Sequence, residues 1–207
     1  MASINGRDRL NNLEGLKDSG NYPKRILDLA TSLGALKYGD FILTSGKKSK
    51  YYFDGRLLTL DPKGSYLVAN AVIHILVESK VKVTAGPAIA AVPIVAAVSA
   101  LSYLQGCPIG AVIIRNEAKK HGTGKIIEGI LEKGDRVAVV DDTCSTGGSL
   151  LRAIEQVEES GGEVVKVISI LDRHMGGSDL IKSKGYDFIT ILDADVEGKI
   201  KSGIQTI

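Results

Sequence analysis

Apolar runs and helix-spaced stretches alternate through most of the chain. The short apolar runs, which are typical of buried strands, are 81–86, 109–115, 136–140, 164–171 and 188–192. The stretches whose apolar residues recur at helical spacing are 61–79, 89–104, 148–160 and 180–184. Strands that alternate with helices are typical of a parallel sheet covered on both faces. The pattern therefore predicts an α/β fold with a parallel, doubly wound sheet.

The residues before about 60 do not follow this alternation. Residues 24–39 have helical spacing and end at a glycine, and residues 41–58 are typical of two strands joined by a Ser-Gly turn. We expect residues 1–60 to form a small hood at the edge or top of the sheet. Residues 61–207 are expected to form the core, and both parts should belong to one structural domain.

Composition excludes several classes of protein. The net charge of the 207 residues is +2, which argues against a nucleic-acid or membrane-surface partner. The uncharged stretch 83–114 is long enough to cross a bilayer, but its prolines and glycines favour a strand, a helix and a second strand inside the domain. Only two cysteines are present and the N-terminus has no apolar signal core, so we expect a cytoplasmic protein with reduced thiols.

Two adjacent acids, Asp141 and Asp142, follow the apolar run 136–140. A glycine-rich loop and a predicted helix come next. The start of a helix attracts anions, and Gly147 and Gly148 let a phosphate approach the backbone closely. The hydroxyl donors in this loop are Thr143, Ser145, Thr146 and Ser149. Carboxylates can hold a ribose diol, so the segment predicts a site for ribose 5-phosphate at the carboxyl ends of the strands.

Other interpretations of Asp141 and Asp142 fit the sequence less well than a ribose 5-phosphate site. Taken without the loop, the two acids also fit a helix cap in a solvated turn. They also fit the acidic strand of an NTPase, which needs a phosphate-binding P-loop elsewhere. The candidate at 121–126 has Ile126 after its lysine and Lys119 in place of the first glycine. No dinucleotide fingerprint follows a strand either.

Four segments resemble known phosphoribosyltransferases in the expected order. Residues 137–149 (VAVVDDTCSTGGS) resemble the phosphoribosyl-diphosphate signature of the type I enzymes. Residues 41–56, 115–129 and 170–177 resemble the base-covering segment, the mobile catalytic loop and the late strand of orotate phosphoribosyltransferases. The resemblance implies a type I sheet with a hood. It also implies phosphoribosyl transfer from 5-phosphoribosyl 1-diphosphate to orotate, a step of pyrimidine and UMP biosynthesis.

The resemblance also implies residue roles. The catalytic residues would be Lys119, His121, Asp141 and Asp142. The residues that would bind the diphosphate donor are Arg115, Asn116, Lys119, His121, Asp141, Asp142, Thr143, Cys144, Ser145, Thr146, Gly147, Gly148 and Ser149. Those that would bind orotate are Tyr52, Phe53, Ser145 and Arg173.

The chemistry of these residues agrees with the implied roles. Cationic donors in the loop would stabilise the charge that develops on pyrophosphate. A planar guanidinium suits the orotate carboxylate, although an Arg173–Asp172 ion pair is the alternative. Neighbours on a strand face opposite sides, so only one of Tyr52 and Phe53 should face the base. We expect His74 to have no functional role. For His174 we also favour the interpretation that it has no functional role.

No His/Cys cluster has metal-ligand spacing. The expected cofactor is Mg²⁺, held mainly by the substrate, because magnesium prefers substrate oxygens and water. The resemblance further implies a homodimer that shares the catalytic loop between subunits, with no nucleic-acid or membrane partner. Thr44, Ala90 and Asn116 stand where some family members carry lysine, which predicts weaker donor binding unless other lysines compensate. The candidates for compensation are Lys47, Lys48, Lys120 and Lys125.

Two other functions would fit parts of the pattern. A phosphoribosyltransferase for a purine base would leave Arg173 without a carboxylate to bind. A non-enzymatic regulator that senses the diphosphate would need a DNA-binding module or a basic face, and the small net charge disfavours it.

Overall fold

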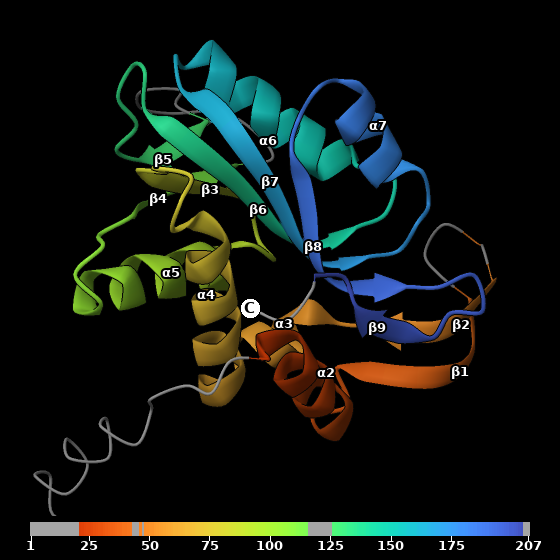
Figure 1. Ribbon diagram of the computed structural model, residues 1–207. Helices are drawn as coiled ribbons and strands as arrows, with labels where there is room; N and C mark the ends of the chain where they lie inside the picture. Colours follow the sequence, from red (N-terminus) through yellow and green to blue (C-terminus); the bar gives the residue numbers. More distant parts are fainter. Residues whose placement is uncertain (1–20, 43–45, 47, 116–125, 205–207) are drawn as a thin grey trace, which may run out of the picture.

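The computed structural model describes residues 21–42, 46, 48–115 and 126–204. Its main sheet has the strand order β5-β4-β3-β6-β7-β8-β9 (Figure 1). The strands are β3 (Val83–Pro87), β4 (Gly110–Ile114), β5 (Ile127–Gly129), β6 (Arg136–Cys144), β7 (Glu163–Asp172), β8 (Phe188–Ala194) and β9 (Ile200–Ser202). The central strands run parallel, and the edge strands β5 and β9 pair antiparallel to their neighbours.

Helices cover both faces of this sheet. Helices α4 (Pro62–Leu76) and α5 (Val92–Leu104) pack on one face, and α6 (Gly148–Glu159) and α7 (Gly177–Ser183) pack on the other (Figure 1). Strand β6 divides its side chains between the two cores: Ala138 and Val140 join α4 and α5, whereas Val137 and Val139 join α6. Burial on both faces confirms the predicted doubly wound sheet.

The described residues of the N-terminal segment form a hood that contains two helices and a separate antiparallel pair of strands. Its elements are α2 (Tyr22–Ser32), β1 (Leu36–Ile42), β2 (Lys48–Phe53) and α3 (Gly55–Thr59). Apolar side chains of the hood such as Ile26, Phe53 and Leu58 lie in the same hydrophobic cluster as those of α4 and β9. The backbone N–H of Ile200 also donates to the Tyr38 hydroxyl at 3.2 Å. The hood and the sheet therefore share one core.

The structure differs from the sequence prediction at several boundaries. The helix predicted over 24–39 ends at Ser32, because the chain turns at Gly34 with φ +69° and enters β1. Strand β6 runs on to Cys144, four residues past the predicted end, because β7 continues to pair with it there. The acid pair thus lies on the strand itself. Among the described residues, no helix is long and apolar enough to cross a membrane.

Candidate active site

A cavity of about 530 Å³ opens at the carboxyl ends of β3, β4 and β6. Its lining comes from residues 87–90, 114–115, 141–143 and 145–149, together with Arg152 and Ala153. Strands β3 and β6 are neighbours, but α5 leads from β3 across one face and α6 leads from β6 across the other. Such a switch point is where open α/β sheets bind ligands. The cavity therefore lies where the sequence placed the sugar-phosphate site.

The loop between β6 and α6 is shaped to present backbone to this cavity. Gly147 adopts φ +81° before the first turn of α6, and no side chain caps that helix. The loop packs tightly on Gly177, whose N–H donates to the Ser145 carbonyl at 2.9 Å. A Cβ on Gly177 would lie only 2.4 Å from the Gly147 nitrogen. The uncapped helix start is therefore held in place, and it can bind an anion.

Asp141 is buried at the floor of the cavity, with 5% of its surface exposed. Its Oδ2 accepts a hydrogen bond from Ser149 Oγ, and its Oδ1 accepts one from the Asp142 N–H, both at 2.9 Å. Burial and the neighbouring charge of Asp142 raise the pKa of Asp141 to about 7, against the lowering effect of these two bonds. The carboxylate form is therefore costly in the empty cavity, and hydroxyl donors or a cation would stabilise it.

Asp142 connects the cavity to the hood. Burial raises the pKa of its carboxyl, while the Thr143 hydroxyl at 3.2 Å and the charge of Arg173 lower it. Its side chain lies directly against Gly55, at the start of α3. Asp142 therefore lies between the phosphate loop and the elements predicted to cover the base.

Arg173 follows β7 and points toward the hood. Its Nη2 donates to the Phe53 carbonyl at 3.1 Å, and its guanidinium lies 5.8 Å from the centroid of the Tyr51 ring. Within the described part of the chain, its Nε is buried and has no hydrogen-bond partner. The alternative ion pair with Asp172 does not form among these residues, because Asp172 accepts from the His174 N–H instead. A buried, unsatisfied donor is costly unless a ligand accepts from it.

Of the two aromatic residues predicted at the base, Tyr52 points outward. It is 40% exposed and packs against Phe41, whereas the Phe53 side chain is buried in the hydrophobic core. Tyr51 lies beneath Arg173 and was not predicted. Its signal in the sequence is the two-residue alternation with Phe53, which by itself does not say which face is inside.

Cys144 corrects one predicted contact. Its side chain is buried among the residues that pack under α6 and is not part of the cavity lining. Burial raises the pKa of this thiol to about 12. The Cys144 side chain therefore does not reach the cavity lining, and a nucleophilic role is disfavoured.

The structure describes only the ends of the predicted catalytic loop. Arg115 lines the cavity, its Nη1 lies 3.4 Å from Glu128 Oε1, and its N–H donates to the Ile126 carbonyl at 2.9 Å. The predicted residues Asn116, Lys119 and His121 lie outside the described residues, as do Thr44, Lys47, Lys120 and Lys125. Ala90, which stands in place of a lysine, does line the cavity.

Arg152 lines the cavity and was missed by the sequence reasoning. It lies one helical turn beyond Gly148, and side chains on a helix lean toward its N-terminus. Within the described residues its guanidinium has no ion pair or hydrogen bond. The sequence signal that could have identified Arg152 is its position four residues after Gly148 of the phosphate loop.

The cavity contains two acids among its described lining, Asp141 and Asp142. A buried carboxyl and a partly buried one, both with raised pKa, fit a site that faces a cation or hydroxyl groups. They do not form a three-ligand metal site. The described set with that geometry is Asp172, His174 and Asp193, which does not line the cavity.

The uncapped start of α6, the acid pair and the crevice at the switch point of the sheet are together typical of an α/β protein that holds a phosphorylated sugar.

Comparison with known proteins agrees. Residues 62–198 match the family model of the phosphoribosyl transferase domain. The orotate phosphoribosyltransferase of Methanopyrus kandleri is 40% identical over 172 residues, which cover 83% of this chain and 90% of that protein. The corresponding enzyme of Nostoc sp. is 40% identical over 180 residues, or 85% and 86%.

Solved structures place the chain in the same group. The Mycobacterium tuberculosis orotate phosphoribosyltransferase in complex with Fe(III) dicitrate has a TM-score of 0.73 at 32% identity, covering 83% of this chain and 96% of that one. The structure of that enzyme with 5-phospho-alpha-D-ribosyl 1-diphosphate has a TM-score of 0.69 at 30% identity and the same coverage. This chain belongs to the phosphoribosyltransferase family and, within it, to the orotate phosphoribosyltransferases.

Proposed function

We propose that this protein transfers the phosphoribosyl group of 5-phosphoribosyl 1-diphosphate to N1 of orotate. The products are orotidine 5′-monophosphate and pyrophosphate, and the reaction is a step in UMP synthesis. The observation that carries the proposal is that two subsites lie side by side. One is the cavity at the start of α6, which contains Asp141 and Asp142. The other lies beyond Asp142 and contains Arg173, whose Nε is buried and has no hydrogen-bond partner among the described residues. The relatives are named for this activity.

The cavity fits the ribose phosphate. The 5′-phosphate would bind at the first turn of α6, with the loop hydroxyls and Arg152 as further donors. Asp141 and Asp142 would accept hydrogen bonds from the ribose hydroxyls. Their charge would also stabilise the positive character that C1 acquires as its bond to pyrophosphate breaks and its bond to orotate N1 forms. The N1–H proton of orotate is released in this step.

The hood side of Asp142 fits the base. The orotate carboxylate would accept from the Arg173 guanidinium, whose Nε lacks a partner among the described residues. Tyr52 and the Ser145 hydroxyl are the further candidates for contact with the ring. Phe53 would contribute through its carbonyl, which already orients Arg173.

Pyrophosphate would be held by Arg115 together with Asn116, Lys119 and His121 of the predicted loop. In this proposal Lys119 and His121 stabilise the leaving group, and the loop comes from the partner subunit of a homodimer. The Arg115 backbone N–H donates to the Ile126 carbonyl, and Arg115 lines the cavity of its own chain, which supports Arg115 as a donor supplied by the same subunit.

We propose Mg²⁺ as the cofactor and the cytoplasm as the location. Mg²⁺ prefers phosphate and hydroxyl oxygens with retained water, so the donor itself would supply most of its ligands and Asp141 and Asp142 would face it. When bound, the ion neutralises charge on the pyrophosphate. A cytoplasmic location is supported by two cysteines that are not joined in a disulfide.

A spectrophotometric assay tests this function. Purified protein, Mg²⁺ and the diphosphate are mixed with orotate, and the loss of orotate absorbance is followed. Uracil, hypoxanthine and adenine are run in parallel. We expect consumption of orotate alone. Turnover of a purine would overturn the base assignment, and binding of the diphosphate without turnover of any base would indicate a sensor.

A further inference from the structure

Two acids stand side by side at the carboxyl ends of β7 and β8. Asp172 and Asp193 are register partners in this parallel strand pair. Asp172 is almost fully buried, with 1% of its surface exposed, and the side chain of Asp193 is 23% exposed. Like charges held this close in a poorly solvated place repel each other, so a group that neutralises them would stabilise the arrangement.

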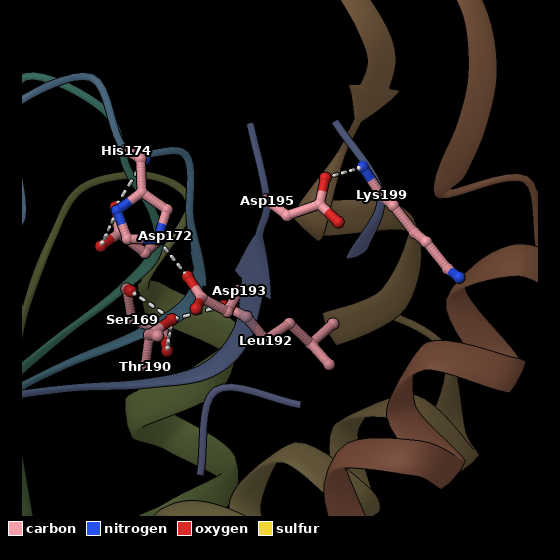
Figure 2. A network of polar contacts seen from close by, with 8 residues as sticks. All are labelled: Ser169, Asp172, His174, Thr190, Leu192, Asp193, Asp195 and Lys199. Carbon is pink, nitrogen blue, oxygen red and sulfur yellow. Dashed lines mark hydrogen bonds and ion pairs between the residues drawn. The ribbon is translucent and has the colours of Figure 1, made fainter. Parts of the chain in front are cut away.

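His174 lies between the two acids. Its Nε2 contacts Asp193 Oδ1, its Nδ1 lies 3.7 Å from Asp172 Oδ2, and its backbone N–H donates to Asp172 Oδ1 at 2.9 Å (Figure 2). Each ring nitrogen therefore faces a different carboxylate. The hydrogen bonds of His174 are the ring contact with Asp193 and the backbone N–H bond to Asp172, and the second ring nitrogen faces Asp172 at a longer distance. A metal ion would have to displace one of these contacts, so the geometry favours a hydrogen-bonded bridge over a metal site.

The bridge sets the conformation of the turn that carries Arg173. His174 adopts φ +48°, which non-glycine residues rarely do and which has to be maintained by contacts elsewhere. The turn begins at Arg173, whose backbone N–H donates to the Cys144 carbonyl at 2.9 Å. In this conformation the guanidinium of Arg173 reaches the Phe53 carbonyl in the hood.

The contacts with His174 also engage Asp172, which is the nearest carboxylate that could compete for the guanidinium of Arg173. Asp172 precedes Arg173 in sequence, yet one of its oxygens accepts from the His174 N–H and the other faces the His174 ring. The charges of Asp172, Asp193 and Arg173 all reach Tyr51, whose pKa is raised mainly by burial and secondarily by the two acids, while Arg173 lowers it. Tyr51 therefore lies close to Arg173 and to both acids.

We propose that His174 is a positioning residue for the acceptor: it holds Asp172 and Asp193 so that Arg173 remains available to a carboxylate on the base. This inference rests on the proposed function and adds a specificity device to it. Without the bridge, Asp172 would compete with the acceptor carboxylate for the same guanidinium.

The test is steady-state kinetics of His174→Asn in the full-length protein. Asparagine tolerates the left-handed backbone but is too short to bridge both acids. We expect the KM for orotate to rise about three- to tenfold, the range of one or two hydrogen bonds. The KM for the diphosphate and kcat should stay within about twofold, since neither depends on the bridge. Thermal unfolding verifies that the variant is folded.

Rescue separates positioning from a general structural role. Adding Asp172→Asn to His174→Asn removes the competing charge and should return the KM for orotate to near the wild-type value. His74→Asn is the matched control, because His74 packs against Tyr22 on α4 and should leave both KM values unchanged.

Three results would overturn the inference. The first is an unchanged KM for orotate in His174→Asn, and the second is an equal loss for both substrates that Asp172→Asn does not rescue. The third is stoichiometric binding of Zn²⁺ or Mn²⁺ by the wild type that His174→Asn abolishes. If the wild type turns over no orotate at all, the proposed function fails together with this inference, which distinguishes that case from the other three.

Discussion

Gly55 lies in direct contact with the side chain of Asp142. A Cβ at Gly55 would be 2.6 Å from both the Cβ and the Oδ2 of Asp142, closer than such atoms approach in proteins. Gly55 begins α3 of the hood, and Asp142 belongs to β6 of the sheet. The hood therefore fixes the position of one of the two acids in the cavity.

Substitution of Gly55 by alanine should displace Asp142. Because Asp142 is proposed to hold the ribose, we expect kcat/KM for the diphosphate to fall at least about tenfold, as small misplacements of substrate-positioning groups can cost still more. Overpacking should cost about 1–3 kcal/mol of unfolding free energy. Gly110→Ala is the control, since its Cβ would make only ordinary contacts at 3.5 Å. Wild-type kinetics in Gly55→Ala would contradict the role given to Asp142.

The stability of the unliganded protein should decrease as the pH rises from about 4 to about 7. Asp141 has a pKa of about 7 in the folded protein against an ordinary value of 3.8 for an aspartate, so the folded state binds its proton more tightly. The resulting destabilisation is absent at low pH and complete above pH 7, at about 4 kcal/mol or less. The raised pKa of Asp142 acts in the same direction.

Asp141→Asn should flatten this pH dependence and stabilise the unliganded protein at pH 8. Thermal unfolding between pH 4.5 and 8.5 measures both effects. Asp28→Asn, at an exposed ion pair with Lys24, serves as the control and should leave the profile as in the wild type. A profile for Asp141→Asn that matches the wild type would show that another group is responsible.

Loss of the Arg152 guanidinium should weaken binding of the donor. We expect Arg152→Gln to raise the KM for the diphosphate about three- to thirtyfold, which corresponds to one charge-assisted hydrogen bond partly open to solvent. Arg152→Lys should recover part of the loss. Lys184→Gln is the control, because Lys184 lies in a neighbouring hollow that Arg152 also borders but does not line the cavity itself, and its loss should have little effect. Equal KM values for Arg152→Gln and Lys184→Gln would exclude a specific role for Arg152.

Lys119→Ala tests the predicted catalytic loop. If Lys119 stabilises the departing pyrophosphate, kcat should fall by about a hundredfold or more, because the interaction is strongest in the transition state. Thermal stability should change little. Single-turnover and steady-state rates, measured together, separate the chemical step from product release. A fully active Lys119→Ala enzyme would remove this residue from the mechanism.

The sequence predicts the centre of the fold better than its edges. The strands β3, β4, β6, β7 and β8 lie inside the sheet, and the central strands β3 and β6 are buried on both faces for most of their length, so apolar runs mark them. The edge strands β5 and β9 have three residues each and form only because a neighbour is available to pair with. Pairing with β7 also carries β6 through two acids that local propensity would place in a loop.

The site could be predicted where chemistry follows directly from residue type. The acid pair and the glycine-rich loop line the cavity as expected. What could not be predicted depends on which way a side chain points. Cys144 lies inside the loop motif but faces the core, and Tyr51, next to the predicted pair, lies beneath Arg173. His174 shows its importance only when β8 places Asp193 beside Asp172.

Because the hood and the sheet share one core, the segment that matches the phosphoribosyl transferase domain depends on the hood and on β9 for its folding. The family match at 62–198 leaves out the hood and β9, yet both contribute buried side chains, such as Ile26 and Ile200, to the cluster that α4 covers. A fragment cut to these bounds would expose that apolar surface to water. It would be expected to aggregate rather than fold, because the segments that complete its interior lie on either side of the catalytic signature.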